Sequence, residues 1–267
     1  MPNSPIYTLR SKELFHQHRL QIYQRTDALF AALMCVQWIA AIGAALWLSP
    51  KTWIGQYSQT HLHVWVAIFL GGAIMSLPVY FAFAHPGRML TRHVIAIGQM
   101  LMGSLLIHLT GGRIETHFHV FGSLAFLSFY RDWRVLISAS AVVAVDHLLR
   151  GMYWPQSVFG TFTVESWRWL EHAGWVIFED IFLIRACLQS RQEMWQIAER
   201  QAQIEETKLF VEQEVLDRTS DLRESEERFR SALQYAAIGM ALVSPDGRFL
   251  QVNRSLCTIL GYSDEEL

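Results

Sequence analysis

The sequence predicts an all-α polytopic membrane protein with about six transmembrane helices, then a cytoplasmic coiled-coil helix and the truncated start of an α/β domain. Three observations predict this fold class. Long apolar runs fill the chain before residue 190, and the chain is 52% hydrophobic but only 17% charged. The next stretch is rich in Glu, Arg and Gln, with apolar residues at heptad-like spacing. The last segment alternates short apolar runs with turn-forming residues.

The transmembrane helices follow from the length of the apolar runs. A hydrocarbon core of roughly 30 Å requires about 20 apolar residues in a helix. The connection 151–164 contains Pro155 and Gly160 and is expected to be re-entrant or to lie at the membrane interface. The predicted spans are residues 28–48, 61–84, 94–110, 114–130, 133–149 and about 165–187.

The distribution of basic residues predicts the orientation of these spans. Lys and Arg are enriched in cytoplasmic loops of membrane proteins. Basic residues precede the first span and recur after every second span, so both termini are expected on the cytoplasmic side. The residues on that side are Arg10, Lys12, Arg19, Arg25, Arg88, Arg92, Arg131, Arg134, Arg185 and Arg191.

Charge and cysteine usage exclude some classes of function. A net charge of −2 argues against a nucleic-acid partner. The cysteines Cys35, Cys187 and Cys257 are scattered along the chain, so neither a disulfide framework nor a thiolate metal site is indicated. The lipid bilayer is the first partner that the composition implies.

Histidines from several spans fall at one depth in this topology. His108 ends the third span, His117 and His119 begin the fourth, His147 ends the fifth, and His172 lies early in the sixth. All are therefore expected in the outer half of the bundle. Residues four apart on a helix share a face, so Glu115 and His119 are expected to face one neighbour while His117 points elsewhere. An irregular entry into this helix would instead turn both histidines inward.

Such a cluster predicts a functional site, because ionisable groups in a membrane are costly. Imidazole is a common ligand of Zn, Cu and Fe, so we expect a transition metal or haem b. The candidate ligands for either are His117, His119, His147 and His172, and a metal would next recruit His108 and Glu179. A proton relay or pH sensor, and interfacial histidines with no ligand, remain alternatives.

The stretch 190–225 is expected to be a coiled-coil signalling helix that joins two chains into a homodimer. The alternative is a single solvated helix, since Glu and Arg dominate its surface. The apolar positions of the seam, which extends past residue 225, are Met194, Ile197, Ile204, Val211, Val215, Leu222 and Phe229.

The C-terminal segment resembles the opening of a PAS (S-box) domain. Two strands, at 238–243 and 249–252, are expected on either side of a Ser-Pro-Asp-Gly turn, with a short helix at 254–260. The match is too short for a whole PAS domain, so we expect the chain to stop inside one. The resemblance rests on Ser225–Arg230, Ala237–Val243, Ser244–Gly247, Arg248–Asn253 and Gly261–Leu267.

This resemblance implies a bacterial inner-membrane sensor. In similar proteins a membrane sensor, a helical linker and a PAS domain lead to an output domain, most often a histidine kinase and otherwise a diguanylate cyclase. The stretches 116–133 and 167–180 also resemble the membrane module of sensor kinases. The expected downstream partner is a response regulator or an effector domain. No H-box, N-box or GGDEF sequence is present, so catalysis cannot be assigned to this chain.

The expected organisation has four parts: a cytoplasmic segment 1–26, a six-helix sensory domain 27–189, a signalling helix 190–225 and an incomplete PAS domain 226–267. The expected function is the input half of a signal-transduction protein. Three rivals remain: an integral-membrane metal or haem redox enzyme with a regulatory tail, a transporter or proton-coupled module, and a membrane anchor for a PAS sensor.

Overall fold

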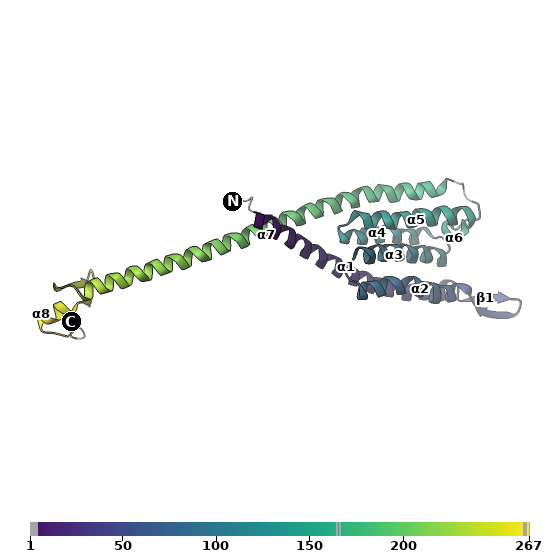
Figure 1. The fold of residues 1–267 in the computed structure, drawn as a ribbon. Coiled ribbons are helices and arrows are strands. Elements are labelled where there is room, and N and C mark those ends of the chain that lie inside the picture. Colours follow the sequence, from purple (N-terminus) through teal and green to yellow (C-terminus); the bar gives the residue numbers. More distant parts are fainter. Residues whose placement is uncertain (1–4, 164, 166, 264–265, 267) are drawn as a thin grey trace. The chain divides into compact units, whose positions relative to one another are not determined.

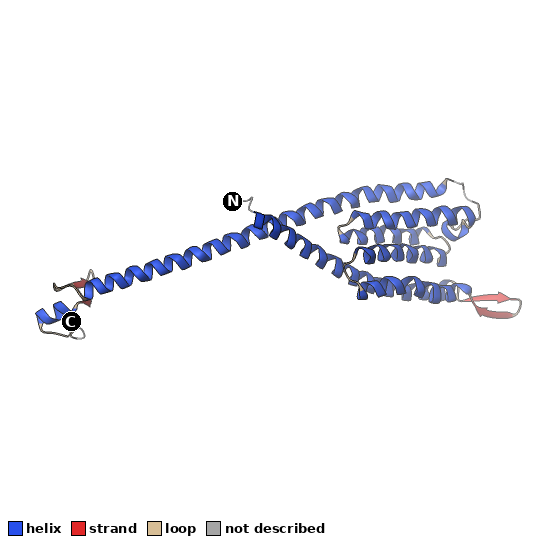
Figure 2. Cartoon of the chain, in the orientation of Figure 1, coloured by secondary structure: helices blue, strands red, loops and turns tan. Residues whose placement is uncertain are grey.

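The computed structural model describes residues 5–163, 165, 167–263 and 266 of the chain. The chain divides into two compact units, Met1–Ala202 and Gln203–Leu267. Helices dominate the first unit, and short strands occur in both units (Figures 1 and 2). Val164, at the end of the predicted re-entrant connection, and residues 264, 265 and 267 of the Gly261–Leu267 motif lie outside the described residues.

The elements of the first unit follow one another through short connections. A hairpin of β1 and β2, paired antiparallel from Lys51↔Thr60 to Ile54↔Tyr57, separates the first two helices. A 3-10 turn, Ser128–Tyr130, ends the fourth helix. In order, the elements are α1 (Pro5–Leu48), β1 (Lys51–Ile54), β2 (Tyr57–Thr60), α2 (Leu62–Ala84), α3 (Met89–Leu109), α4 (Ile114–Leu127), α5 (Trp133–Tyr153), α6 (Gln156–Phe159) and α7 (Arg168–Gln234).

Within the part of the chain that the structure describes, four helices are long and apolar enough to cross a membrane: Thr8–Leu48, Leu62–Ala84, Met89–Leu109 and Trp133–Tyr153. Four of the about six predicted spans therefore coincide with helices of sufficient length and apolar character. The fourth predicted span forms a helix of 14 residues, α4, which is short for a bilayer. The sixth lies within α7 and carries Glu171, Glu179, Asp180 and Arg185, whose charges lower its apolar character.

In the expected N-terminal segment 1–26, the described residues are helical, since α1 runs from Pro5 directly into the first apolar run. The expected connection 151–164 contains the one-turn helix α6. The hairpin of β1 and β2 was not predicted; its turn contains Gly55 at φ +62°, a left-handed conformation that glycine adopts without steric cost.

Helix α3 lies at the centre of the first unit, with α1, α2, α4 and α5 packed around it. Its residues Ile95, Ala96, Met100 and Ile107 are buried in the main apolar core. A Cβ atom on Gly98 would lie 2.4 Å from Cγ of Pro78 on α2, so the absence of a side chain permits this close approach.

Helix α7 contacts the N-terminal half of α1 at the end of the first unit. Met194, Ala198 and Ala202, spaced four residues apart, pack against Leu14 and Phe15. Met194 was expected to be the first seam position of the coiled coil. In this structure it is 4% exposed and packs within its own chain, so the uncovered part of the seam begins after it.

The second unit comprises the end of α7, two strands and a short helix. The strands β3 (Ala241–Val243) and β4 (Phe249–Val252) pair antiparallel with an irregularity at Leu242/Val243, and α8 (Arg254–Leu260) follows. These bounds agree with the predicted strand 249–252 and helix 254–260, while the first predicted strand is shortened at its N-terminal end.

Asn253 holds this small unit together and is 1% exposed. Its Oδ1 accepts hydrogen bonds from the backbone N–H groups of Met240 (2.8 Å) and Leu256 (2.9 Å), the second of which caps α8. Its Nδ2 donates to the carbonyl oxygens of Leu233 (3.0 Å) and Ile238 (2.8 Å). One side chain thus connects the end of α7, the strand entry and α8.

Candidate ligand site at a histidine triad

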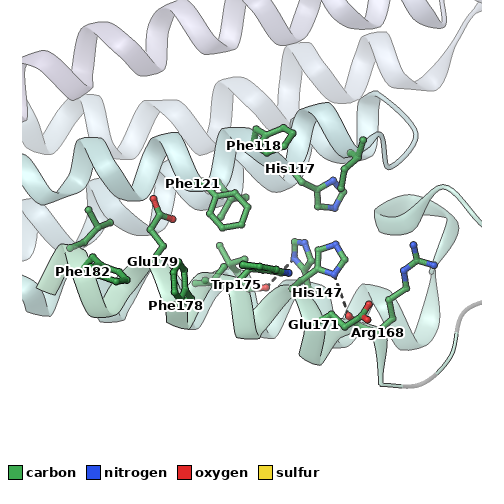
Figure 3. A pocket seen from close by; sticks show the side chains of 16 residues that line it. His117, Phe118, Phe121, His147, Arg168, Glu171, Trp175, Phe178, Glu179 and Phe182 are labelled. Atoms are coloured by element: carbon green, nitrogen blue, oxygen red, sulfur yellow. Dashed lines mark hydrogen bonds between the residues drawn. The ribbon is translucent and has the colours of Figure 1, made fainter.

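Three helices bring His117, His147 and His172 into mutual contact. Figure 3 labels the first two. His117 lies in the first turn of α4, His147 near the end of α5 and His172 near the start of α7. Their ring centroids are 5.5 Å (117–147), 5.3 Å (117–172) and 5.6 Å (147–172) apart. We call these residues the histidine triad.

Each imidazole of the triad is oriented by its own helix. Nδ1 of His117 donates to the carbonyl oxygen of Arg113 (2.9 Å), that of His147 to Val143 (3.1 Å), and that of His172 to Arg168 (3.2 Å). A carbonyl oxygen only accepts, so Nδ1 carries the proton in all three rings. Nε2 is then unprotonated in each neutral ring, and this is the form that binds metals.

A carboxylate supports one member of the triad. Oδ2 of Asp146 lies 3.3 Å from Nδ1 of His147, and Asp146 also accepts two hydrogen bonds from the Arg150 guanidinium, at 2.8 and 2.6 Å. Carboxylates that contact the distal ring nitrogen of a ligating histidine fix its orientation and raise its basicity. The Asp146–Arg150 pair thus has the arrangement of a supporting outer shell.

The loop before α4 is fixed by a close backbone contact. Gly111 and Gly112 have φ of +71° and +73°. A Cβ on Gly112 would lie 2.4 Å from the backbone nitrogen of Gly160, which follows α6. The adjacent ring of Phe159 packs 5.2 Å from His172 and 6.4 Å from His147. Glycines that permit this approach therefore hold α6 beside the triad.

A cavity of about 920 Å³ adjoins the triad, between α4, α5 and α7. Its wall is mainly apolar, with Phe118, Phe121, Trp175 and Phe178 among the lining residues (Figure 3). Nε2 of His117 is buried and has no hydrogen-bond partner within the part of the chain that the structure describes. Apolar cavities with a few convergent polar groups are typical of ligand sites.

The ring spacing of the triad fits a single metal ion. Three imidazoles bound to one ion through bonds of about 2.0–2.1 Å place their centroids roughly 5–6 Å apart. Among residues 5–163, 165, 167–263 and 266, however, no group of three or more His, Cys, Asp or Glu side chains is arranged as a ready metal site. The ring centroids are thus spaced as in a three-histidine site, but in this structure the ring nitrogens are not arranged around one point.

The same spacing does not fit a bis-histidine haem. Two axial imidazoles lie on opposite faces of the macrocycle, and the porphyrin ring fills the plane between them. In the triad, every pair has a third imidazole within 5.6 Å of both members, where that ring would lie. The residues present therefore do not fit haem b.

His119 lies apart from the triad. Two residues after His117, it is rotated by about 200° around the helix axis. It accepts a hydrogen bond from Nε2 of Gln37 on α1 (2.9 Å), and a Cβ on Gly103 of α3 would lie 3.0 Å from its Nδ1. The structure therefore separates this predicted ligand from the other three. Glu115, which was expected to share its face, is exposed.

His108 belongs to a second group of histidines. Its ring centroid lies 5.0 Å from that of His63, which in turn is 4.4 Å from His61. Nδ1 of His108 is 2.8 Å from Oγ of Ser157. The sequence placed His108 at the depth of the other candidate ligands but gave no signal that it would pair with the start of α2 and not with α4.

Glu179 lines the same cavity as the triad, two helical turns along α7 from His172. Its Oε2 is buried without a partner among the described residues. The neighbouring Asp180 accepts a hydrogen bond from Oγ of Ser140 (2.5 Å). The predicted ligand Glu179 is therefore a second polar point in the cavity wall, and it does not contact the histidine rings.

Comparison with known proteins bears on the second unit. Residues 227–267 match the PAS domain family. This is the PAS segment of the chain, as the resemblance of its motifs implied. No solved structure matches the chain.

One curated relative extends this assignment. A protein named probable diguanylate cyclase DgcE, from Escherichia coli strain K12, is 59% identical over 46 residues. The match covers 17% of this chain and 4% of the relative, so the chain spans only a small part of that protein's length. It supports a PAS sensor protein, and the four apolar helices of the first unit indicate a membrane protein.

Proposed function

We propose that this chain is the sensory half of a bacterial inner-membrane signalling protein and that the histidine triad binds one transition-metal ion, Cu, Zn or Fe. In this proposal α4 and the first part of α7 complete a six-helix bundle, with both termini in the cytoplasm. One observation carries the proposal: three imidazoles from three helices, each with Nδ1 tied to a carbonyl oxygen, border one cavity. Three neutral Nε2 ligands would hold the ion and leave a further coordination position toward Glu179 or a small ligand.

Helix α7 is the element through which ion binding would act. It carries His172 and continues without a break to Gln234, at the start of the PAS segment. On the side that faces the bundle, Val176 and Cys187 of α7 are buried in the main apolar core, and Leu183 and Ile184 are partly buried against it. An ion that binds His172 more tightly in one position of α7 than in another shifts the equilibrium toward that position.

A homodimer through the later part of α7 fits this mechanism. The seam residues Ile204, Val211, Val215, Leu222 and Phe229 are all exposed in the single chain, from 49% to 70%. An apolar stripe on a charged helix is buried when a second copy supplies the facing stripe. A change in the register or rotation of this coil is the proposed signal to the PAS segment.

The proposed output is a diguanylate cyclase or a histidine kinase beyond the PAS segment. The E. coli relative, whose name describes a probable diguanylate cyclase, favours the first. The resemblance of the membrane stretches to those of sensor kinases favours the second, with a response regulator as its partner. Both outputs use the same input mechanism, so the proposal for the triad is independent of this choice.

Metal content tests the proposal directly. The full chain, purified in nanodiscs, is loaded with Cu, Zn or Fe, desalted and measured by elemental analysis. We expect about one ion per chain, and at least a tenfold weaker affinity in the variants His117→Ala and His147→Ala, since each removes one of three ligands. His18→Ala, which alters a histidine on α1 outside the triad, is the matched control and keeps the ion.

A second measurement separates a sensor from a membrane anchor. In a cysteine-free background, Val211→Cys reports disulfide formation between two copies of the coil. The metal is expected to change the rate of this reaction in the parent chain and to leave it unchanged in His172→Ala.

In the metal-content experiment, no bound ion, or equal loss in the His18→Ala control, would overturn the metal site. A Soret band that is lost in the triad variants would indicate that the site holds haem and not a single ion. A response to pH that needs the triad but no metal would favour a pH sensor.

A further inference from the structure

A second cavity, of about 520 Å³, lies at the other end of the first unit, where α3 and α5 begin. Tyr23, Gly87 and Tyr130 form part of its wall, and Asp132 is the one carboxylate among its lining residues. We call it the arginine cavity, because five guanidinium groups line it: Arg19, Arg92, Arg131, Arg134 and Arg191.

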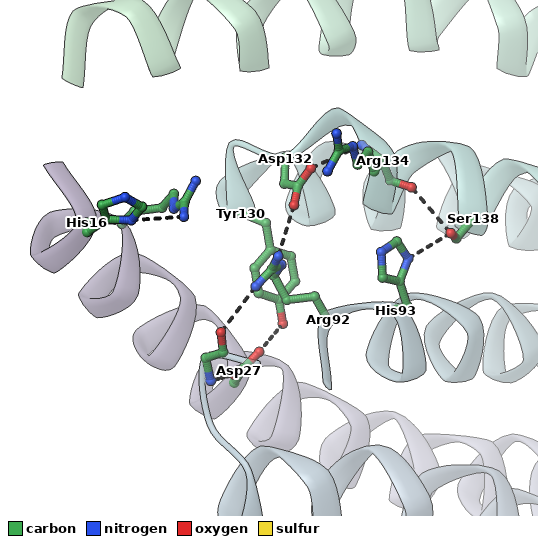
Figure 4. A network of polar contacts seen from close by, with 10 residues as sticks. His16, Asp27, Arg92, His93, Tyr130, Asp132, Arg134 and Ser138 are labelled. Carbon is green, nitrogen blue, oxygen red and sulfur yellow. Dashed lines mark hydrogen bonds and ion pairs between the residues drawn. The ribbon is translucent and has the colours of Figure 1, made fainter. Parts of the chain in front are cut away.

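Arg92 lines this cavity and is itself buried; Figure 4 shows its polar contacts. It is 6% exposed, and its guanidinium lies 3.8 Å from the centroid of the Tyr23 ring. Its Nη2 pairs with Asp132 (3.1 Å) and its Nη1 donates to the carbonyl oxygen of Gly87 (3.2 Å). Its Nε is buried and has no acceptor among the described residues. A buried donor without an acceptor is costly, so the Arg92 guanidinium beside the cavity keeps hydrogen-bonding capacity that the chain does not use.

The remaining arginines are not neutralised by the chain. In the described ranges, Arg19, Arg131, Arg134 and Arg191 form no salt bridge with a carboxylate. The nearest side-chain partner of Arg19 is Nδ1 of His16, 3.1 Å from its Nη2. Among the described residues that line the cavity, five positive groups therefore accompany one carboxylate, which Arg92 already engages. This excess of positive charge attracts a ligand with more than one negative charge.

Backbone geometry presents two of these arginines together. Arg131 has φ +53°, a left-handed conformation that ends the turn Ser128–Tyr130 and reverses the chain into α5. Asp132 then caps α5, since its Oδ1 accepts from the backbone N–H of Arg134 at 3.3 Å. The same carboxylate thus fixes the position of Arg134 through α5 and that of Arg92 through the ion pair.

We infer that the arginine cavity binds a phosphate group. Guanidinium groups donate parallel hydrogen bonds that match phosphate oxygens, and a phosphate carries the multiple acceptors and negative charge that these groups lack. A volume of about 520 Å³ exceeds that of inorganic phosphate and admits a phosphate with an attached organic group. The source is an acidic phospholipid headgroup or a soluble phosphorylated metabolite, and the two share this chemistry.

The test uses the full chain, purified in a neutral detergent. Native mass spectrometry and thermal-shift titration measure binding of three probes: phosphatidylglycerol, phosphatidylcholine and pyrophosphate. The variant R134Q/R191Q removes two exposed guanidiniums from the cavity and keeps the buried Arg92. The control R25Q/R185Q removes the same charge from exposed arginines on α1 and α7 that do not line the cavity.

The expected result is binding of phosphatidylglycerol, pyrophosphate or both, weakened about tenfold in R134Q/R191Q and little changed in R25Q/R185Q. Binding of phosphatidylglycerol alone assigns a lipid headgroup, and binding of pyrophosphate alone assigns a soluble ligand. If both variants weakened binding equally, the ligand would be attracted by the general positive charge at the membrane boundary and not by the arginine cavity, and the inference would be overturned. Failure of all three probes to bind, or equal binding of phosphatidylcholine and phosphatidylglycerol with no effect of R134Q/R191Q, would overturn it too.

Discussion

The Tyr130 hydroxyl donates a hydrogen bond of 2.7 Å to Oδ1 of Asp27, joining positions 103 residues apart (Figure 4). Both side chains are 0% exposed. Oδ2 of the same carboxylate accepts from the backbone N–H of Gly87 (2.6 Å), and the Tyr130 ring stacks on Phe30 at 5.9 Å. Asp27 therefore joins α1, the α2–α3 connection and the end of α4 at a single carboxylate.

Replacement of Tyr130 by Phe tests this junction. The substitution keeps the ring but leaves one oxygen of a buried carboxylate without its donor, which costs about 1–3 kcal/mol. For a domain of this size that lowers the apparent Tm by roughly 2–4 °C per kcal/mol. Differential scanning fluorimetry of the detergent-solubilised chain measures it. Tyr153→Phe, on a tyrosine that is 82% exposed, is the control, and an equal shift in both variants would refute the role of the hydrogen bond.

The seam of α7 makes a second prediction. Val215→Asp and Leu222→Asp place a carboxylate in the proposed dimer interface, where burial without a partner is unfavourable. We expect each to raise the dimer dissociation constant by at least about tenfold, equivalent to roughly 1.4 kcal/mol. Light scattering after size exclusion measures the mass of the particle.

The control for this experiment is Ser220→Asp, which adds the same charge at an exposed position outside the seam. Circular dichroism checks that the helix persists in all three variants. A dimer that survives Leu222→Asp, or that dissociates equally in Ser220→Asp, would favour the single solvated helix over the coiled coil.

Asn253 makes a prediction for the PAS segment. Asn253→Ala removes two acceptor and two donor interactions with buried backbone groups, including the cap of α8, and we expect a loss of about 2–4 kcal/mol in local stability. Hydrogen exchange of the amides from 238 to 256 measures this loss as faster exchange. Thr258→Ala, which removes one exposed bond to the carbonyl oxygen of Arg254, is the control and should alter exchange only slightly. Similar exchange in both variants would contradict the central role of Asn253.

The last described turn predicts a dependence on pH. Backbone N–H and Oγ of Ser263 both donate to Oε2 of Glu266, at 2.8 and 2.9 Å; the first of these bonds is the Glu half of a capping box. These hydrogen bonds hold the pKa of the Glu266 carboxyl below its usual range. A lowered folded-state pKa means that the turn is stabilised above the unfolded-state pKa and loses this contribution as pH falls through the folded value.

Nuclear magnetic resonance of the Ser263 amide follows this titration. We expect its chemical shift to change at a pH below the usual Glu value, and the change to be absent in Glu266→Gln. Glu226→Gln, on an exposed glutamate of α7, is the control and leaves the transition in place. A midpoint at or above the usual Glu value would contradict the hydrogen bonds.

The sequence predicted the gathering of histidines better than their pairing. Span positions and loop charges sufficed to bring His117, His147 and His172 to one end of the bundle, because depth follows from residue count along a helix. Depth alone does not decide which faces meet. His119 and His108 lie at a similar depth but contact Gln37 and His63, and those contacts depend on the rotation and neighbours of each helix.

The short elements of the PAS segment were predictable for a different reason. Turn chemistry and alternation are local, so the strand 249–252 and the helix 254–260 followed from adjacent residues. The Asp27–Tyr130 bond had no such signal, because a lone aspartate before an apolar run more often lies in water. The arginine cavity likewise requires four separate segments to meet, which no local pattern encodes.

The contact between Gly112 and Gly160 has a consequence for sequence variation among relatives of this chain. Gly111 and Gly112 both have positive φ, a backbone conformation that most other residues adopt only with strain. The backbone cost of a substitution is therefore similar at the two positions. Space distinguishes them: a Cβ at 111 meets nothing within 4 Å, while one at 112 meets backbone atoms of Val158 and Gly160 at 2.4–2.8 Å. Asn is therefore an acceptable replacement at 111, while position 112 tolerates glycine alone for as long as α6 stays beside the triad.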